Sequence, residues 1–288
     1  MEQGDVNAAP EGSAREPHLL MMSATPIPRT LSMSYYADLD VSVIDELPPG
    51  RQPVLTKLVA ASRRSEVIER IRTACAEGRQ AYWVCPIIEE SETLDLQTAI
   101  ETHAALAGEL EGFQVGLVHG RLAPADKAAV MGRFIQGELQ VLVATTVIEV
   151  GVDVPNASLM VIEHAERFGL AQLHQLRGRV GRGQAQSACV LLYQSPLSEG
   201  ARQRLKVIYE NTDGFAIAQA DLQLRGPGEY LGKRQSGAPL LRFADLVADG
   251  DLLDMAREAA EDLLDHDPDS AERHLTRWLG SQSRFMLA

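Results

Sequence analysis

The stretch Gln140–Ile162 reads QVLVATTVIEVGVDVPNASLMVI and contains two short apolar runs, Gln140–Ala144 and Leu159–Ile162. Short apolar runs bounded by turn residues are typical of strands that are buried on both faces. Similar runs occur on either side, at Val54–Val59, Ala81–Pro86, Gln114–Val118 and Ala188–Tyr193. Helical patterns lie between the runs, near residues 62–77, 94–111, 124–136 and 169–177. Strands that alternate with helices predict βαβ units, and therefore an α/β fold with a mostly parallel sheet.

The segments outside this alternation follow other patterns. Residues 1–17 are rich in Gly, Ala, Pro and Glu and show no periodicity, which favours disorder. The run His18–Ser23 predicts a buried strand and Val41–Leu47 a second strand, before the breaker Pro48-Pro49-Gly50.

Residues 198–224 predict two helices joined at Thr212-Asp213-Gly214, where Thr212 or Asp213 caps the second. Residues 243–280 predict acidic helices with an apolar face.

The charge is unevenly distributed along the chain. The net charge of the 288 residues is −13, which is unusual for a protein that binds nucleic acid. Residues 163–242, however, carry 11 basic and 7 acidic groups, a net charge of +4. We therefore expect any contact with phosphates in this segment.

Composition also limits the class of protein. No apolar run approaches the roughly 18 residues of a membrane helix, and the start lacks the basic and apolar regions of a signal peptide. The three cysteines lie far apart and form no CxxC pair, which argues against a zinc site or a disulfide framework. These features predict a cytoplasmic protein without a membrane partner or a bound metal.

The stretch Gln172–Gly183, QLHQLRGRVGRG, carries the strongest functional signal. It interleaves three arginines with three glycines, and each glycine would cost a purely structural helix about 1 kcal/mol. Glycines let a backbone approach a ligand closely, and the arginine fork matches phosphate oxygens. The pattern Q-x-x-G-R-x-G-R, from Gln175 to Arg182, resembles motif VI of superfamily 2 helicases. The resemblance implies that Arg179 and Arg182 act as arginine fingers on the transferred phosphoryl group of ATP, with Gln175 beside them.

The stretch Val141–Ala157 resembles motif V of the same helicases. Hydroxyl groups and free N–H groups where a strand leads into a helix suit phosphate binding. The resemblance implies that Thr145 and Thr146 face the DNA backbone. It places Gly151 and Asp153 on the nucleotide side of the cleft.

Further motifs narrow the resemblance to RecG-type DNA helicases. Ser23–Thr30, SATPIPRT, is similar to an extended motif III, which RecG shares with the transcription–repair coupling factor. Ala81–Ser91 resembles the motif IV region. Val118–Arg121 resembles the family's HG turn, which places His119 near the DNA. Residues 36–51, YADLDVSVIDELPPGR, are similar to RecG and unlike the coupling factor.

Residues 211–237 resemble the RecG element that couples ATP turnover to translocation on double-stranded DNA. In that family the element is a helical hairpin followed by an extended loop. The resemblance makes Arg204, Arg225 and Gln235 the candidate residues for coupling and DNA contact.

Two expected parts of a complete motor do not occur in the sequence. The P-loop pattern G-x₄-G-K-[ST] is missing, because Gly226–Arg234 has the wrong spacing and Arg234 where Ser or Thr should stand. An acidic run suited to Mg²⁺ is missing as well. We therefore expect the C-terminal part of a RecG-type helicase, which uses ATP and Mg²⁺ only when intact and binds neither tightly by itself.

The resemblance implies a division of the chain into five parts. The partners of the chain would be branched double-stranded DNA and two further domains of the enzyme, an N-terminal wedge domain and a first motor domain. The protein would be a monomer. The expected parts are a disordered segment 1–17, the end of the first motor domain and a linker 18–50, a RecA-like second motor domain 51–196, a helical hairpin with coupling loop 197–240, and C-terminal acidic helices 241–288.

Two alternatives stay open at this point. The chain could come from the coupling factor, a translocase that removes stalled RNA polymerase without separating strands. It could also be a non-catalytic module that binds DNA or another domain.

Overall fold

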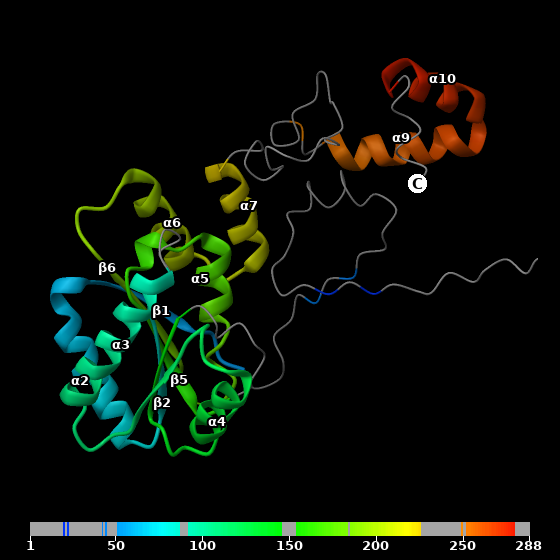
Figure 1. Cartoon of the computed structure of the whole chain (residues 1–288). Helices are drawn as coiled ribbons and strands as arrows, with labels where there is room; N and C mark the ends of the chain where they lie inside the picture. The colour runs from blue at the N-terminus through cyan, green and yellow to red at the C-terminus, as the bar shows by residue number, and fades with distance from the viewer. Residues whose placement is uncertain are drawn as a thin grey trace, which may run out of the picture.

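The computed structural model of the chain describes residues 51–86, 92–145, 154–183, 185–225 and 252–279, and the single residues 20, 22, 42, 44 and 249. Within these residues, six parallel strands form one sheet in the order β1-β6-β5-β2-β4-β3 (Figure 1). The strands are β1 Leu55–Ala60, β2 Gln80–Val84, β3 Val115–Val118, β4 Val141–Ala144, β5 Ala157–Ile162 and β6 Ala188–Tyr193. The predicted α/β fold with a parallel sheet is confirmed.

Helices cover both faces of the sheet. The pair α2 and α3 lies on one side, and α4 and α5 lie on the other (Figure 1). The helices are α2 Arg64–Ala76, α3 Glu92–Glu109, α4 Pro124–Ile135, α5 Leu170–Arg177, α6 Glu199–Glu210, α7 Gly214–Arg225, α9 Leu253–His266 and α10 Pro268–Leu279, with 3₁₀ turns η1 Ala61–Arg63 and η3 Ala165–Arg167.

Alternation along β2 shows why the sheet is buried on both faces. Tyr82 and Val84 belong to the apolar core shared with α4 and α5, whereas Ala81 and Trp83 belong to the core shared with α2 and α3. All five residues of β2 are buried. A strand without a polar face needs helices on both sides, which explains the unbroken apolar runs in the sequence.

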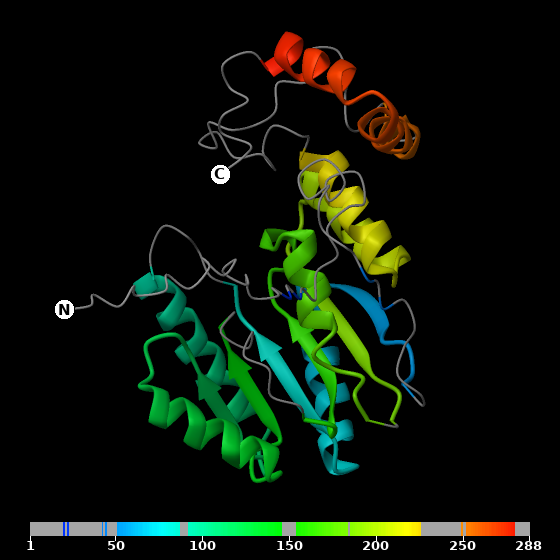
Figure 2. The same cartoon turned by 90° about the vertical axis from the view of Figure 1, so that its right-hand side faces the viewer.

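The helices after β6 extend this layout. The hairpin α6–α7 packs on the α5 side, where Leu205, Ile208 and Ile217 join the core. Asp213 caps α7, because its carboxylate accepts hydrogen bonds from the backbone N–H groups of Phe215 (3.1 Å) and Ala216 (3.1 Å). The helices α9 and α10 lie beyond α7 in both views (Figure 2).

The parallel strands give the sheet two different edges. At the carboxyl edge, the strands β2, β3, β4 and β5 end and are followed by Cys85, His119, Thr145 and Glu163. At the amino edge, residues 51–54, 155–156 and 187 lead into β1, β5 and β6. Among the described residues, no helix is both long and apolar enough to cross a membrane.

The two strands predicted before residue 51 are wrong at the residues that can be compared. Leu20, Met22, Ser42 and Ile44 lie in no strand or helix, and all four are exposed. In the described part of the chain the sheet begins at β1. The remaining residues of these two segments lie outside the described part.

Candidate functional site

The arginine-rich stretch Gln172–Gly183 forms most of α5 and the turn that leads from α5 to the amino edge of the sheet. The helix ends at Arg177, and the three glycines that would have weakened it all follow. Gly178 forms the C-terminal cap, and Gly181 takes a left-handed conformation with φ +82°. In the turn that results, Arg179 is partly buried and Arg182 is exposed. Gln175 is partly buried in the last turn of α5.

Two glycines of the turn are packed too tightly for a side chain. A Cβ at Gly181 would lie 2.7 Å from Cγ2 of Val54, which precedes β1. A Cβ at Gly183 would collide with the backbone carbonyl of Pro155, which precedes β5. The glycines thus bring the arginine turn against the amino edge and next to the end of the motif V stretch.

Arg51 holds this turn from a distant part of the chain. Its Nε donates to the carbonyl of Gly181 (3.1 Å), and its Nη2 donates to the carbonyl of Gly178 (3.3 Å). Gly178 directly precedes Arg179, and Gly181 lies between Arg179 and Arg182. Both hydrogen bonds therefore hold the backbone next to the two candidate arginine fingers. The sequence did not identify Arg51, and the only signal there was a basic residue directly after a Pro-Pro-Gly breaker.

Arg177 has a role that the sequence did not reveal. Its guanidinium is buried and donates to the carbonyls of Ile208 (2.8 Å) and Asn211 (2.8 Å) at the end of α6. It also donates to the Nδ1 of His174 (3.1 Å). Burial lowers the pKa of Arg177, because charge is less stable away from water. This arginine therefore fastens α5 to the α6–α7 hairpin.

The carboxyl edge brings Thr145 and His119 close together. Thr145 is buried, and its backbone N–H donates to the carbonyl of Val118 (3.3 Å), the residue before His119. Lys127 donates to the carbonyl of Gly120 (2.7 Å). The pKa of His119 is lowered by burial and by the neighbouring charges of Lys127 and Arg121. The edge is thus positively charged at the turn where the sequence predicted DNA.

Arg204 contacts the turn that leads into α5. From α6, its Nη2 donates to the carbonyl of Glu166 in η3 (2.8 Å). The other candidate residues cannot be placed: Thr146, Gly151, Asp153 and Gln235 lie outside the described residues, as does the side chain of Arg225. The structure therefore brings together Gln175, Arg179 and Arg182 at one end of α5, and Thr145 and His119 at the other edge.

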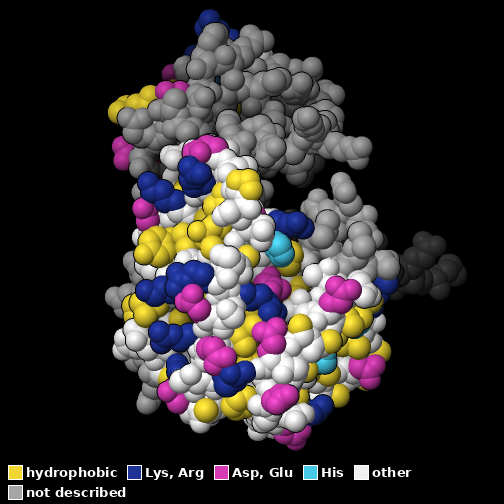
Figure 3. Space-filling model, turned by 90° about the vertical axis from the view of Figure 1, so that its left-hand side faces the viewer, with side chains coloured by type: hydrophobic (Ala, Val, Ile, Leu, Met, Phe, Trp, Pro, Cys, Tyr) yellow, Lys and Arg dark blue, Asp and Glu magenta, His cyan; other side chains and the backbone are white. Residues whose placement is uncertain are grey.

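A separate surface depression of about 420 Å³ lies over β1, the end of β6 and α6. Leu58, Tyr193 and Tyr209 line it together with Arg202 and Lys206. The face in Figure 3 shows hydrophobic and basic side chains next to one another, with acidic ones between them. None of the candidate residues lines this depression. Among the described residues, no group of three His, Cys, Asp or Glu side chains is arranged to hold a metal ion.

Known proteins resemble the chain over most of its length. A family model described as "Helicase conserved C-terminal domain" matches residues 63–184, and one described as "ATP-dependent DNA helicase RecG, domain 3, C-terminal" matches residues 211–278. The ATP-dependent DNA helicase RecG of Acidithiobacillus ferridurans is 59% identical over 92% of the chain, and that of Escherichia coli K12 is 57% identical over 93%. The chain belongs to the RecG family.

A solved structure described as RecG bound to a three-way DNA junction agrees in fold. It is 49% identical, with a TM-score of 0.64 over 81% of this chain and 30% of that one. The chain spans 39% of the length of the two RecG relatives, and it corresponds to the RecG C-terminal region.

Proposed function

We propose that the chain is the second motor domain and coupling element of an ATP-dependent RecG helicase that translocates on branched double-stranded DNA. The observation that carries this proposal is the glycine turn after α5, which presents Arg179 and Arg182 at the amino edge. The division into parts at residues 17, 50, 196 and 240 follows from the same proposal. Branched substrates would include stalled forks and Holliday junctions.

The arginine turn would form one wall of an ATP site between two motor domains. Arg182, which is exposed, and Arg179 would stabilise the negative charge on the γ-phosphoryl group, and Gln175 would support them. Gly151 and Asp153 would line the same side, since Pro155, near the end of the motif V stretch, lies beside Gly183. A P-loop and the Mg²⁺ site would come from the first motor domain. We therefore expect the chain alone to lack ATPase activity.

The carboxyl edge would meet the DNA. Thr145 and Thr146 would contact backbone phosphates, and His119 would lie next to them in a turn that Arg121 and Lys127 make positive. The relative in the solved structure is bound to a three-way junction, which supports a branched substrate. We place the protein in the cytoplasm, and we expect it to act as a monomer.

The α6–α7 hairpin would couple the two edges. Arg204 contacts η3 and Arg177 fastens the hairpin to α5, so a shift of the arginines on ATP binding would move the hairpin. Arg225 and Gln235 would carry that movement to the DNA.

Unwinding tests the proposal directly. The full-length protein that contains this chain should separate forked and four-way DNA with ATP, and leave a linear duplex of equal length intact. Equal activity on linear duplex, or none on any branched DNA, would contradict the branched-DNA assignment. Capture of RNA polymerase would favour the coupling factor, and DNA binding without any ATPase would favour a non-catalytic module.

A further inference from the structure

The ends of β2 and β5 are joined at the carboxyl edge. The backbone N–H of Glu163, which directly follows β5, donates to the carbonyl of Val84 at the end of β2 (2.9 Å). From this point β2 continues through Cys85 and Pro86 towards α3, in the stretch that resembles motif IV. By contrast, β5 continues through η3 into α5 and the arginine turn. Glu163 thus lies at the carboxyl edge that we propose to meet DNA, at the start of the segment that leads to the arginine turn.

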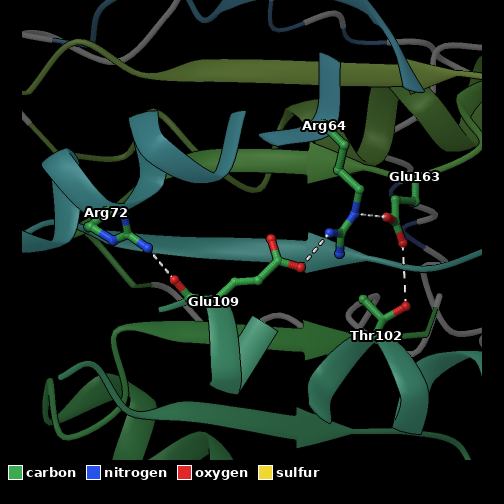
Figure 4. Close-up of polar contacts among 5 residues, drawn as sticks. All are labelled: Arg64, Arg72, Thr102, Glu109 and Glu163. Atoms are coloured by element: carbon green, nitrogen blue, oxygen red, sulfur yellow. Dashed lines mark hydrogen bonds and ion pairs between the residues drawn. The ribbon is translucent and has the colours of Figure 1, made fainter. Parts of the chain in front are cut away.

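The carboxylate of Glu163 holds three elements together. Its Oε1 accepts a hydrogen bond from the Nε of Arg64 at the start of α2 (2.9 Å), and its Oε2 accepts one from the hydroxyl of Thr102 in α3 (3.5 Å). The Sγ of Cys85 lies 3.9 Å from the same oxygen. Figure 4 shows Arg64 and Thr102 approaching the carboxylate from two helices. The side chain is only 15% exposed, so solvent screens these contacts weakly.

Arg64 links this carboxylate to β2 and α3. Its guanidinium lies over the ring of Trp83, 4.9 Å from the centroid, and its Nη1 contacts Glu109 at the end of α3 (3.0 Å). Burial alone would lower the pKa of Arg64, but the two carboxylates outweigh it and raise the pKa. The cation is therefore held by two anions and an aromatic face, which fixes its position.

The segment after Glu163 is held by several contacts and connects Glu163 to the start of α5. His164 has a left-handed backbone (φ 49°, ψ 45°), which a histidine rarely adopts. Its Nδ1 lies 3.2 Å from the Glu166 carboxylate, which also accepts a hydrogen bond from the backbone N–H of Gln194 (3.2 Å). Phe168 is buried just before α5 begins. A turn fixed at so many points has little freedom to absorb a shift at Glu163.

The end of β2 lies beside Thr145, because the backbone N–H of Cys85 donates to the carbonyl of Ala144 (2.8 Å). We propose that Arg64 and Glu163 are positioning residues that connect DNA contact at Thr145 with the arginine turn at the end of α5. We assign neither residue a direct contact with ATP or DNA. When DNA bound at Thr145 displaces the neighbouring end of β2, the pair passes that displacement to the start of α5, so that bound DNA raises the rate of ATP hydrolysis. This inference rests on the proposed function and adds a specific route for DNA stimulation.

The test compares two rates in the full-length protein that contains this chain. ATP hydrolysis is measured without DNA and with saturating forked DNA, for the wild type, Glu163→Gln and Arg64→Lys. The matched control is Glu66→Gln. Glu66 lies on α2, as Arg64 does, and its exposed carboxylate pairs with Arg63. We expect the ratio of the two rates to fall about fivefold or more in both test variants, in the usual range of coupling between sites, and to stay unchanged in the control.

The ratio separates coupling from stability. A purely structural role would lower both rates by the same factor, because fewer molecules would be folded, and an unchanged ratio in both variants would overturn the inference. If Glu163→Gln lowers the melting temperature too far for assay, Arg64→Lys, which keeps the cation, decides alone. If DNA does not stimulate ATP hydrolysis by the wild-type protein, the proposed function is wrong, and this inference fails with it.

Discussion

Three arginines within six residues have three different environments. Arg177 is buried against α6, Arg179 is partly buried, and Arg182 is exposed beside the glycine turn. Residue type is the same in all three, so only the environment distinguishes an arginine that holds the fold from one that can reach a ligand. This distinction leads to two predictions with opposite outcomes.

Arg182→Ala should abolish catalysis without affecting folding. We expect DNA-stimulated ATP hydrolysis of the full-length protein to fall by about 10³-fold or more, as when an arginine finger is removed. DNA binding and melting temperature should not change, because the side chain is exposed. Arg133→Ala, which removes an exposed arginine of α4, serves as the control. Wild-type ATPase in Arg182→Ala would contradict the finger assignment.

Arg177→Met should affect stability. The substitution keeps much of the side-chain volume but leaves the carbonyls of Ile208 and Asn211 without their donor. Each buried group that loses its partner costs about 1–3 kcal/mol, so urea should unfold this variant of the chain at a clearly lower concentration. Arg133→Met provides the comparison on an exposed site. Coincident unfolding curves of Arg177→Met and wild type would show that the buried contacts add nothing.

From the sequence, candidate residues could be named only where their chemistry follows a local pattern. Gln175, Arg179 and Arg182 belong to one short motif, and Thr145 follows a recognisable strand. Arg51 was missed because its partners lie about 130 positions away, and no local pattern reveals such a contact. The partners of Arg177, which lie 31 and 34 positions away, were missed for the same reason.

At the scale of elements, the strands and helices from β1 to α7 could be predicted because their local preferences agree with the fold. All six strands are short apolar runs, and their observed ends differ from the predicted ones by at most a few residues. The prediction failed at the described residues of the two strands expected before residue 51, since residues 20, 22, 42 and 44 are exposed and lie in no strand. An apolar run specifies a strand only if a neighbouring strand and a covering layer exist.

The turn after α5 should be sensitive to a single methyl group. Gly181→Ala places a Cβ both in the left-handed region and 2.7 Å from Val54. Gly78 is a matched control, since it has the same φ of +82° and open space around it. We expect Gly78→Ala to cost about 1–2 kcal/mol of unfolding free energy from backbone strain alone. Gly181→Ala should cost more, and urea unfolding of the two variants measures the difference. A smaller loss for Gly181→Ala would mean that Val54 yields easily.

The junction of α5 with the α6–α7 hairpin should weaken in acid. Burial, and then the charge of Arg177, lowers the pKa of His174, whose Nδ1 accepts a hydrogen bond from Arg177. The unfolded chain therefore takes up this proton at a higher pH than the folded chain. Stability from the neutral ring is fully present above about pH 6.5, the usual value, and is lost as pH falls towards the lower folded pKa.

Urea unfolding at pH 7.5 and pH 5.5 measures this effect. The wild type should lose stability between the two values, and His174→Gln should lose less, because glutamine carries no titratable proton. An equal loss in both proteins would show that other groups are responsible.

At the scale of the whole molecule, the fold places the residues that we propose for two functions at opposite edges of one sheet. The arginine turn lies at the amino edge, and Thr145 and His119 lie at the carboxyl edge. The sequence named residues for both functions but could not show this separation, which depends on strand order and register. If both assignments hold, a change at one edge has to reach the other, and helix α5 with the α6–α7 hairpin would provide that connection.

The central claim is that this chain supplies the arginine wall of an ATP site shared with another domain. The most direct measurement is ATP hydrolysis by this chain alone, and by the chain mixed with the separately expressed N-terminal portion of its Acidithiobacillus ferridurans relative, each with and without forked DNA. We expect hydrolysis only in the mixture, stimulated by DNA and lost with Arg182→Ala. Hydrolysis by the chain alone would contradict it, since that would require a nucleotide site within this chain.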